Sequence, residues 1–377
     1  MTNQRILVLQ TGGTIGQERN KSGVFHPSQR DYLPLIRGIS LKRGQELKST
    51  PKKIRLYENR SYVMEATHTL PRIDFDAIQT ANIDSTNMET HQRADIAKLI
   101  YDNARSYDGF VVIHGTDSMA DTGAALPLML RNLDKPVVIT GSQKSIYERG
   151  SDADCNVINA IETATMDIGE VVIAFGDKIV RGNRAVKVNE QGLNAFDSPR
   201  VAPVGEIGID IMLKDHRYTR SDGDPILFTD FCDNVESYAP KSGSNTSAFR
   251  KGYVDNDDVE GIVFVGLGAG NINDKYNQDI KRAVQAGKPV LVVTNCLEGA
   301  ADSGIYGVGS APLEAGAKPA GDMTSESINQ KLMYAIGRAK ADSIDTNGVP
   351  EYVDRIIRRP YAGEINFSDE RVNKNVA

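Results

Sequence analysis

Residues 109–140 read GFVVIHGTDSMADTGAALPLMLRNLDKPVVIT. This stretch begins with an apolar, β-branched run at Gly109–His114 and ends with another at Pro136–Thr140. Between the two runs, Ala120–Arg131 has the pattern of a helix. A strand, a helix and a strand in this order predict a βαβ unit, in which the two strands lie parallel in one sheet.

The same alternation of apolar runs and helical patterns extends along most of the chain. Because the strands are apolar on both faces, they predict a mainly parallel sheet that helices cover on both sides. The expected fold class is therefore α/β, with a doubly wound sheet and right-handed crossovers. Further strands are expected at Ile6–Leu9, Glu170–Phe175, Gly261–Val265 and Pro289–Thr294, and further helices near Asn156–Met166, Lys275–Ala286 and Glu326–Ala339.

A chain of 377 residues is long enough for two or three domains. The stretch Ser221–Asp258 breaks the rhythm because it is rich in Pro, Gly, Ser, Asn and acidic residues. We expect a large N-terminal domain over residues 1–215, a linker over 216–233 and a smaller C-terminal α/β domain over 234–377. A second irregular stretch, Gln45–Ile83, falls inside the first domain.

The composition argues against several classes of protein. Acidic residues outnumber basic ones by 50 to 44, so the net charge is −6 and nucleic acid is not an expected partner. The three arginines within Arg355–Arg359 are expected on a solvated helix face. No apolar run is long enough to span a membrane, and the first, Ile6–Leu9, is too short for a signal peptide. We therefore expect a cytoplasmic protein with no membrane partner.

The cysteines and histidines show no pattern of a disulfide or a metal site. Cys155, Cys232 and Cys296 are far apart and odd in number, which suits a reducing compartment. The five histidines do not have the spacing of metal ligands. The sequence therefore implies neither a metal nor a cofactor.

Polar and glycine-rich segments follow several of the expected strands, where open α/β sheets bind their ligands. Taken singly, each segment has an ordinary interpretation: a tight turn, a helix N-cap, a packed histidine at His114 or a solvent-facing lysine at Lys187. None of them clearly matches the dinucleotide-binding or phosphate-loop pattern. The segments are Gln10–Gly16 (QTGGTIG), His114–Met119 (HGTDSM), Arg181–Lys187 (RGNRAVK) and Gly266–Asn271 (GLGAGN).

Taken together, QTGGTIG and HGTDSM resemble the two threonine motifs of the bacterial-type L-asparaginase/glutaminase amidohydrolases. The likeness continues through residues 133–143 (LDKPVVITGSQ), 181–187 and 321–332 (GDMTSESINQKL). The final stretch, 358–370 (RRPYAGEINFSDE), resembles the end of the cytoplasmic type I subgroup. The resemblance implies the glutaminase/asparaginase fold, with a large and a small α/β domain, and hydrolysis of L-asparagine to L-aspartate and ammonia without a cofactor.

The resemblance also implies four catalytic residues. Thr14 matches the first catalytic threonine, and Thr116 matches the second, with Asp117 and Lys187 as its partners. A threonine hydroxyl needs a base to become a nucleophile, and a desolvated lysine can serve in place of histidine. Which of the two threonines attacks first stays open.

The same resemblance implies which residues bind the substrate. Asp117 would hold the α-amino group, and a neighbouring subunit would contribute Asn271 beside it. Ser142 lies where a backbone carbonyl lines the pocket for the side-chain amide. Such sites form between the subunits of a homodimer, and two dimers often pair into a homotetramer. The segment that would hold the α-carboxylate contains Asp84, Ser85 and Thr86, with Ser85 as the best match.

The chain departs from the family in the lid loop that follows the first motif. The family has a tyrosine there whose hydroxyl contacts the first threonine, whereas residues 17–27 contain none. Just after Gly23, either Phe25 or Val24 falls near the expected position. Phenylalanine can exclude water but cannot polarise a threonine hydroxyl, which predicts a weaker or differently tuned amidase. Candidates to replace the missing hydroxyl in space are Tyr32, Tyr57 and Tyr62.

Two further positions bear on regulation. Cys296 resembles the effector-pocket cysteine of the type I subgroup, while Val186 stands where that subgroup often has a threonine tied to control by substrate. Control by substrate is therefore not expected, although Cys296 marks a candidate effector site. Judged without the resemblance, Cys296 is expected to be a packed core thiol.

Three other functions stay open beside L-asparagine hydrolysis. The first is a related ω-amidase that acts on L-glutamine or a D-amino-acid amide. A tRNA-borne amide is disfavoured, because that group has an extra N-terminal barrel and the first strand starts here at Ile6. The second is a non-catalytic sensor of asparagine or aspartate, although a pure binder has no need of Lys187. The third is a nucleotide-binding protein built on the glycine-rich loops.

Overall fold

The computed structural model divides the chain into two compact units. The first unit comprises Met1–Thr229 and the second Asp230–Ala377. The expected linker, residues 216–233, spans this division, and the domain boundaries 1–215 and 234–377 stay predictions. The structure describes residues 4–28, 30–36, 39–41, 57–64, 72–219, 225–301 and 307–366.

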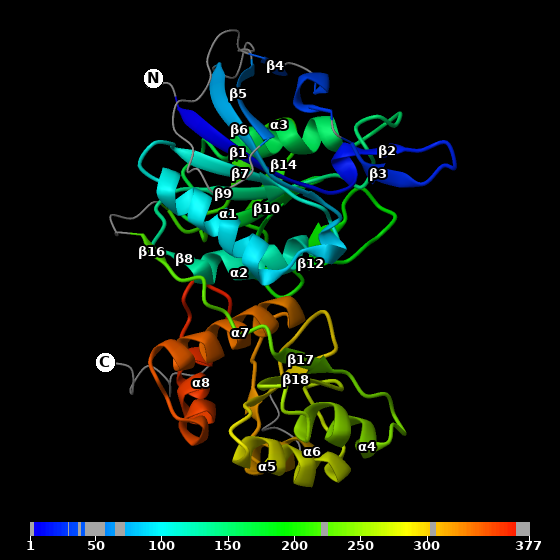
Figure 1. Cartoon of the computed structure of the whole chain (residues 1–377), viewed down its shortest axis with the longest axis vertical. Coiled ribbons are helices and arrows are strands. Elements are labelled where there is room, and N and C mark those ends of the chain that lie inside the picture. The colour runs from blue at the N-terminus through cyan, green and yellow to red at the C-terminus, as the bar shows by residue number, and fades with distance from the viewer. Residues whose placement is uncertain are drawn as a thin grey trace. The chain divides into compact units, whose positions relative to one another are not determined.

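The first unit is built on a ten-stranded sheet with a parallel centre (Figure 1). Its strands lie in the order β15-β14-β11-β10-β9-β7-β1-β6-β5-β4. The central strands other than β6 are buried along most of their length, and together with β6 they confirm the predicted doubly wound, mainly parallel sheet. They are β10 (Val171–Phe175), β9 (Val137–Thr140), β7 (Gly109–Ile113), β1 (Arg5–Gly12) and β6 (Ile73–Ile83).

Antiparallel strands extend this sheet at both edges. On one side are β5 (Tyr57–Met64) and β4 (Ile39–Leu41). On the other side are β11 (Lys178–Arg181), β14 (Gly205–Ile207) and β15 (Ile211–Leu213).

The interpretation of Gln45–Ile83 as irregular was wrong where the structure describes it, because β5 and β6 lie there. Residues 45–56 and 65–71 of that stretch lie outside the described residues. Strand β6 escaped notice because it carries a buried carboxylate, Asp76, in place of an apolar residue. That carboxylate accepts hydrogen bonds from Tyr107 Oη at 2.7 Å and Arg5 Nη2 at 3.1 Å.

Helices cover both faces of the large sheet. Ile6 and Val8 of β1 share one buried cluster with Val157 of α3, so the residues between them point to the opposite face. Figure 1 shows α1 and α2 on that opposite face. Helix α2 is buried nearly all round, which explains why it reads as an almost continuous apolar run. The helices are α1 (Thr90–Asn103), α2 (Met119–Met129) and α3 (Ala153–Thr163).

The predicted βαβ unit is confirmed, with one difference at the end of its helix. Helix α2 ends at Met129, and β8 (Leu130–Arg131) follows at once. Strand β8 pairs antiparallel with β16 (Ile226–Leu227), which lies within the expected linker. Part of that linker is therefore tied by hydrogen bonds to the first unit.

The second unit contains a four-stranded parallel sheet in the order β17-β18-β19-β20. It confirms the predicted smaller α/β fold. The strands are β17 (Val235–Tyr238), β18 (Gly261–Gly266), β19 (Val290–Thr294) and β20 (Lys318–Pro319). The helices are α4 (Thr246–Phe249), α5 (Asn277–Gln285), α6 (Gly307–Glu314), α7 (Ser325–Ala341) and α8 (Val349–Ile357).

A buried ion pair fastens the end of the described chain to helix α7. Lys331 Nζ lies 2.6 Å from Glu364 Oε1, and both side chains are almost fully buried. The arginines near the end of α8 are exposed, as the sequence predicted. Within the described residues, no helix combines the length and the hydrophobicity needed to cross a membrane.

Candidate active site

The predicted site residues of the first unit follow four neighbouring parallel strands. Ser142 comes after β9, Thr116 after β7, Thr14 after β1 and Ser85 after β6. These strands are adjacent in the order β9-β7-β1-β6. Because the carboxyl ends of parallel strands meet at one edge of a sheet, the four residues share that edge.

The two threonine motifs touch through their glycines. Gly13 has a φ of +87°, a conformation that suits glycine, and it precedes the short 3-10 turn η1 (Thr14–Gly16). A Cβ atom added to Gly13 would lie 2.4 Å from Gly115 Cα, so a side chain there would collide with the second motif. Glycine at position 13 thus lets the backbones that carry Thr14 and Thr116 approach closely.

Ser85 is bound to the second motif by two hydrogen bonds. Its Oγ accepts from the Asp117 amide at 3.2 Å, and its carbonyl accepts from Ser118 Oγ at 2.6 Å. Ser85 begins the 3-10 turn η3 (Ser85–Asn87), which Asp84 caps by accepting from the Thr86 amide at 3.0 Å. Hydrogen bonds from the side chain and backbone of Thr86 hold the pKa of Asp84 below its usual value.

Lys187 bridges the two side chains that the sequence assigned to it. Its Nζ donates to Thr116 Oγ1 at 2.9 Å and to Asp117 Oδ1 at 2.7 Å. Thr116 is buried, whereas the side chain of Asp117 is 53% exposed and that of Lys187 is 21% exposed. The carboxylate therefore faces solvent, where a ligand has access to it, whereas most of Thr116 is covered by the protein.

A short hairpin delivers Lys187 to this position. Strand β12 (Val186–Lys187) pairs antiparallel with β13 (Phe196–Asp197). The ring of Phe196 packs edge-on against Phe175 at the end of β10, with 5.1 Å between ring centroids. This aromatic contact anchors the hairpin at the same edge of the sheet as the threonine motifs.

His114 is a packed, hydrogen-bonded histidine, as the sequence predicted. Its Nδ1 lies 2.7 Å from the Gly115 carbonyl and its Nε2 lies 2.9 Å from Thr122 Oγ1. Complete burial lowers the pKa of His114 to about 4. At neutral pH the imidazole is therefore uncharged, with Nδ1 donating and Nε2 accepting.

The lid loop forms a hairpin that begins immediately after the first motif. Strand β2 (Gln17–Arg19) pairs antiparallel with β3 (Phe25–Pro27), and Gly23 in the turn has a φ of +80°. The Arg19 guanidinium lies 4.1 Å above the ring of Phe25, whereas Val24 is exposed at the tip. Phe25 is thus the half-buried aromatic of the lid.

One of the candidate tyrosines packs against the first motif. A Cβ added to Gly16 would lie 2.9 Å from Tyr32 Cε1, so the phenol ring sits directly on the η1 turn. Burial raises the pKa of Tyr32 above its usual value. Tyr62 Oη instead donates to Asp31 at 2.6 Å, and the side chain of Tyr57 lies outside the described residues.

Asn271 and Cys296 follow two adjacent strands of the second unit. Asn271 comes after β18, where its backbone pairs with Leu267, and Cys296 comes after β19. The prediction that Cys296 is a packed core thiol was wrong, because its side chain is exposed. The buried apolar run ends at Thr294, and Cys296 belongs to the turn beyond it.

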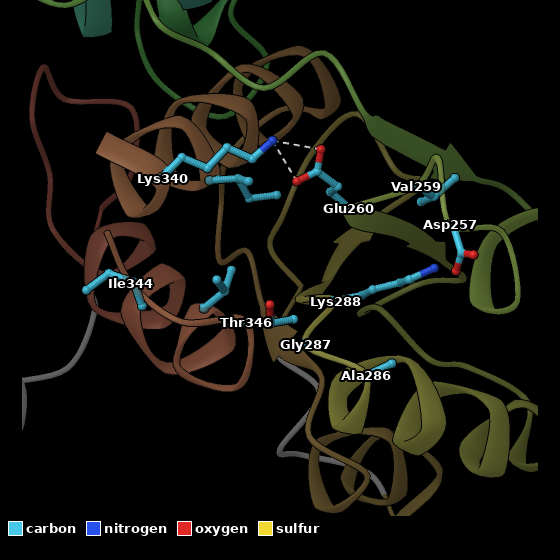
Figure 2. Close-up of a pocket in the computed structure, with 11 residues that line it drawn as sticks. Asp257, Val259, Glu260, Ala286, Gly287, Lys288, Lys340, Ile344 and Thr346 are labelled. Atoms are coloured by element: carbon cyan, nitrogen blue, oxygen red, sulfur yellow. Dashed lines mark hydrogen bonds and ion pairs between the residues drawn. The ribbon is translucent and has the colours of Figure 1, made fainter. Parts of the chain in front are cut away.

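A hollow of about 300 Å³ opens at the other edge of the small sheet, near the amino ends of β18 and β19 (Figure 2). Its two lysines already have protein partners. Lys340 Nζ lies 2.7 Å from Glu260 Oε2, and Lys288 Nζ donates to the carbonyls of Val254 and Asn256 at 2.9 and 2.6 Å. Both lysines of the hollow are therefore already engaged by the protein itself. Across the described residues, no three His, Cys, Asp or Glu side chains gather closely enough to hold a metal ion.

An open α/β sheet that gathers two threonines, a lysine and a carboxylate at its carboxyl edge defines the class of an α/β hydrolytic enzyme. Comparisons with known proteins show which family of enzymes the chain matches. Residues 5–219 match the family described as Asparaginase, N-terminal, and residues 242–345 match the Glutaminase/Asparaginase C-terminal domain.

Individual relatives agree with these matches. The chain is 32% identical to the L-asparaginase of Thermococcus kodakarensis, over 97% of this chain and 100% of that protein. It is 30% identical to L-asparaginase 1 of Escherichia coli, over 98% of this chain and 100% of that protein. The solved structure of the thermostable L-asparaginase from Thermococcus kodakarensis matches with a TM-score of 0.80 at 31% identity, covering 97% and 100% of the two chains. This chain therefore belongs to the asparaginase family of amidohydrolases, as its sequence motifs predicted.

Proposed function

We propose that this enzyme hydrolyses L-asparagine to L-aspartate and ammonia, with a threonine nucleophile and the triad Thr116, Lys187 and Asp117. The observation that carries the proposal is the position of Lys187 Nζ, 2.9 Å from the hydroxyl of Thr116 and 2.7 Å from the carboxylate of Asp117. The relatives named L-asparaginase support the choice of substrate.

The chemistry assigns a proton path to these three residues. Lys187 acts as the base that accepts the proton of the Thr116 hydroxyl, and the oxygen, or a water that it activates, attacks an amide carbon. The proton then passes to the amide nitrogen, which leaves as ammonia, and one water completes the hydrolysis. Asp117 holds the lysine and stabilises it once it is protonated.

Thr14 is the second nucleophile candidate. Thr14 is half-buried on the turn that touches the second motif through Gly13 and Gly115. In the covalent version of the proposal, Thr14 forms an acyl-enzyme and Thr116 activates the water that hydrolyses it. Main-chain amides near the two threonines would bind the oxyanion. Rapid mixing separates the covalent versions from direct attack by an activated water, because only an acyl-enzyme can give a burst of ammonia before steady state.

The remaining predicted residues form the substrate pocket of this proposal. Ser85 binds the α-carboxylate on the turn that Asp84 and Thr86 stabilise. Asp117 binds the α-ammonium group together with Asn271 of a neighbouring subunit, and the main chain at Ser142 receives the side-chain amide. The enzyme would therefore act as a homodimer or homotetramer.

The test is ammonia release from L-asparagine, L-glutamine and D-asparagine by the wild type and by Lys187→Ala. Lys214→Ala is the matched control, since Lys214 also pairs with a carboxylate, Glu206, at 3.0 Å but lies at the sheet edge. Release from L-asparagine that Lys187→Ala abolishes and Lys214→Ala preserves supports the proposal. No release from a folded wild type that binds aspartate contradicts it and favours a sensor, and a preference for L-glutamine or D-asparagine would make the protein a different ω-amidase.

A further inference from the structure

The segment between β9 and α3, residues 142–152, is folded back on itself by one carboxylate. Asp152 accepts hydrogen bonds from the amides of Gln143 and Lys144, at 2.9 and 3.0 Å, and from Asn156 Nδ2 at 3.0 Å. The segment starts at Ser142, the residue assigned to the amide pocket, and we call it the 142–152 loop. Because its base is fixed in this way, contacts along its length can hold neighbouring elements in place.

One side of the 142–152 loop runs along the first threonine motif. The Ile146 amide donates to the Ile15 carbonyl at 3.0 Å, next to Thr14 in the sequence. Ser145 Oγ donates to the Gln17 carbonyl at 2.5 Å. The loop thus holds the turn that carries Thr14 on both sides of Gly16.

The other contact of the 142–152 loop reaches the hairpin that carries Lys187. Gln143 Nε2 donates to the Glu190 carbonyl at 2.9 Å and lies 3.2 Å from the Gly192 carbonyl and 3.4 Å from that of Asn189. These three carbonyls belong to the turn between β12 and β13. A single side-chain amide therefore clamps this turn to the loop.

The Lys187 hairpin depends on such an anchor because it is short. Strands β12 and β13 have two residues each and form a sheet of only two strands, which is marginally stable by itself. The Phe196 ring secures one end of the hairpin, and Gln143 secures the turn. A displacement of about 1 Å at a reacting group can cost about 100-fold in rate, so the anchor bears directly on the reaction.

We propose that Gln143 is a positioning residue. Through the 142–152 loop, it holds the Lys187 hairpin in a fixed position relative to the turn that carries Thr14. The inference rests on the proposed function and adds to it a link between the two halves of the catalytic machinery. Gln143 itself touches neither Thr116 nor Lys187 in the hydrogen bonds described; it acts through the hairpin turn.

The test compares Gln143→Glu with Gln191→Glu. The first change keeps the size of the side chain but turns a carboxylate toward three carbonyl oxygens, which removes the clamp. The second adds the same charge to the same turn, but Gln191 Nε2 donates to the exposed Glu190 side chain instead. We expect Gln143→Glu to lower kcat for L-asparagine about tenfold with KM changed less than about twofold, and Gln191→Glu to leave both near wild type.

Hydrogen exchange gives a readout that is independent of activity. The amides of Val188 and Asn189 both donate to the Ala195 carbonyl, and these bonds close the hairpin. They should exchange faster in Gln143→Glu and at the wild-type rate in Gln191→Glu, while the melting temperature of Gln143→Glu stays near that of the wild type.

The inference is overturned if Gln143→Glu has the same kcat and the same exchange rates as the wild type. It is also overturned if Gln143→Glu and Gln191→Glu have equal effects, because the added charge alone would then explain the loss. An inactive wild type would contradict the proposed function instead. The exchange experiment would still decide whether Gln143 holds the hairpin, so the two failures are distinguishable.

Discussion

In the proposed triad, Lys187 takes the place that histidine has in many enzymes with a hydroxyl nucleophile, while the nearest histidine in sequence has the wrong properties. His114 is two residues before Thr116, but it is completely buried, hydrogen-bonded at both ring nitrogens and uncharged at neutral pH. Lys187 comes from 71 residues further along the chain and reaches the Thr116 hydroxyl. The local environment, and not proximity in sequence, decides which of the two residues suits the role of a base.

The buried state of His114 predicts a pH-dependent stability. Its pKa is about 4 in the folded protein and 6.5 in an unfolded chain, so the unfolded state binds more protons between these values. Stability therefore falls as the pH is lowered from 6.5 toward 4, by about 2 kcal/mol for this group at pH 5. Urea unfolding at pH 7 and pH 5 measures this decrease in the free energy of unfolding. The decrease should be smaller in His114→Gln than in the wild type by about the amount given for this group. The exposed His91→Gln is the control, and identical losses in all three proteins would refute the assignment.

The missing lid tyrosine yields a second prediction at a single residue. Phe25 packs beneath Arg19 in the hairpin that follows Thr14. Phe25→Tyr keeps the ring and adds a hydroxyl like the one that contacts the first threonine in the family. A well-placed group of this kind typically contributes about 100-fold or more when it takes part in acid–base catalysis. We expect kcat for L-asparagine to rise by at least about fivefold. The rise should stay below the typical contribution, because the residues around position 25 are not adapted to orient a hydroxyl there. Unchanged turnover would mean that the hydroxyl is not what limits this enzyme.

At the scale of an element, the lid hairpin is fastened to the 142–152 loop by an ion pair at Arg19, beyond the hydrogen bond that Ser145 makes to the hairpin's first residue, Gln17. Arg19 donates from Nε and Nη2 to Glu148 Oε1 at 3.1 and 3.0 Å, and from Nη1 to the Gly23 carbonyl at 3.0 Å. The side chains are 55% and 27% exposed, so such a pair is worth only about 0.2–1 kcal/mol. Beyond Gln17 the hairpin is therefore held weakly, as the proposed role of a lid that opens during turnover requires.

Removal of this pair should open the hairpin more often. We expect Glu148→Ala to speed trypsin cleavage after the exposed Lys21 by up to about fivefold, the factor that corresponds to the upper end of the energy of an exposed pair. Glu206→Ala removes a similarly exposed pair with Lys214 at a distant edge and should leave cleavage at Lys21 unchanged. Addition of aspartate should protect the site in both variants. If cleavage in Glu148→Ala matches that in the control, the pair does not hold the lid.

The sequence predicted those elements whose pattern needs no distant partner. Strands β7 and β9 are short apolar runs buried on both faces, and they were found almost to the residue. Strand β6 was missed because its buried Asp76 depends on Tyr107 and Arg5, which lie far from it in sequence. A single sequence does not reveal such a pairing.

The same difference between local patterns and contacts with distant residues decides what could be predicted of the candidate site. From spacing alone, Lys187 was predicted to be an ordinary surface lysine. Only the family resemblance connected it with Thr116. The clamp at Gln143 was not predicted at all, because its three carbonyl partners are backbone atoms and leave no trace in residue types. Cys296 was misjudged because one or two residues beyond a strand end decide whether a thiol is buried or exposed.

At the scale of the whole molecule, the two units carry complementary parts of the proposed site. The first unit holds Thr14, Thr116, Asp117 and Lys187, and the second holds Asn271. The resemblance implies that Asn271 completes the site of a neighbouring subunit. An enzyme built in this way is active only as an oligomer, because each active site then draws on two copies of the chain.

Subunit mixing tests this arrangement directly. Lys187→Ala and Asn271→Ala should each be nearly inactive as homo-oligomers. When the two variants are unfolded together and refolded as dimers, half of the dimers are mixed, and one of the two sites in a mixed dimer combines an intact Lys187 with an intact Asn271. We therefore expect recovery of about a quarter of the wild-type activity. If both residues instead served the site of their own subunit, every site would lack one of them and mixing would restore nothing, which makes the recovered fraction a direct measure of which subunit supplies Asn271.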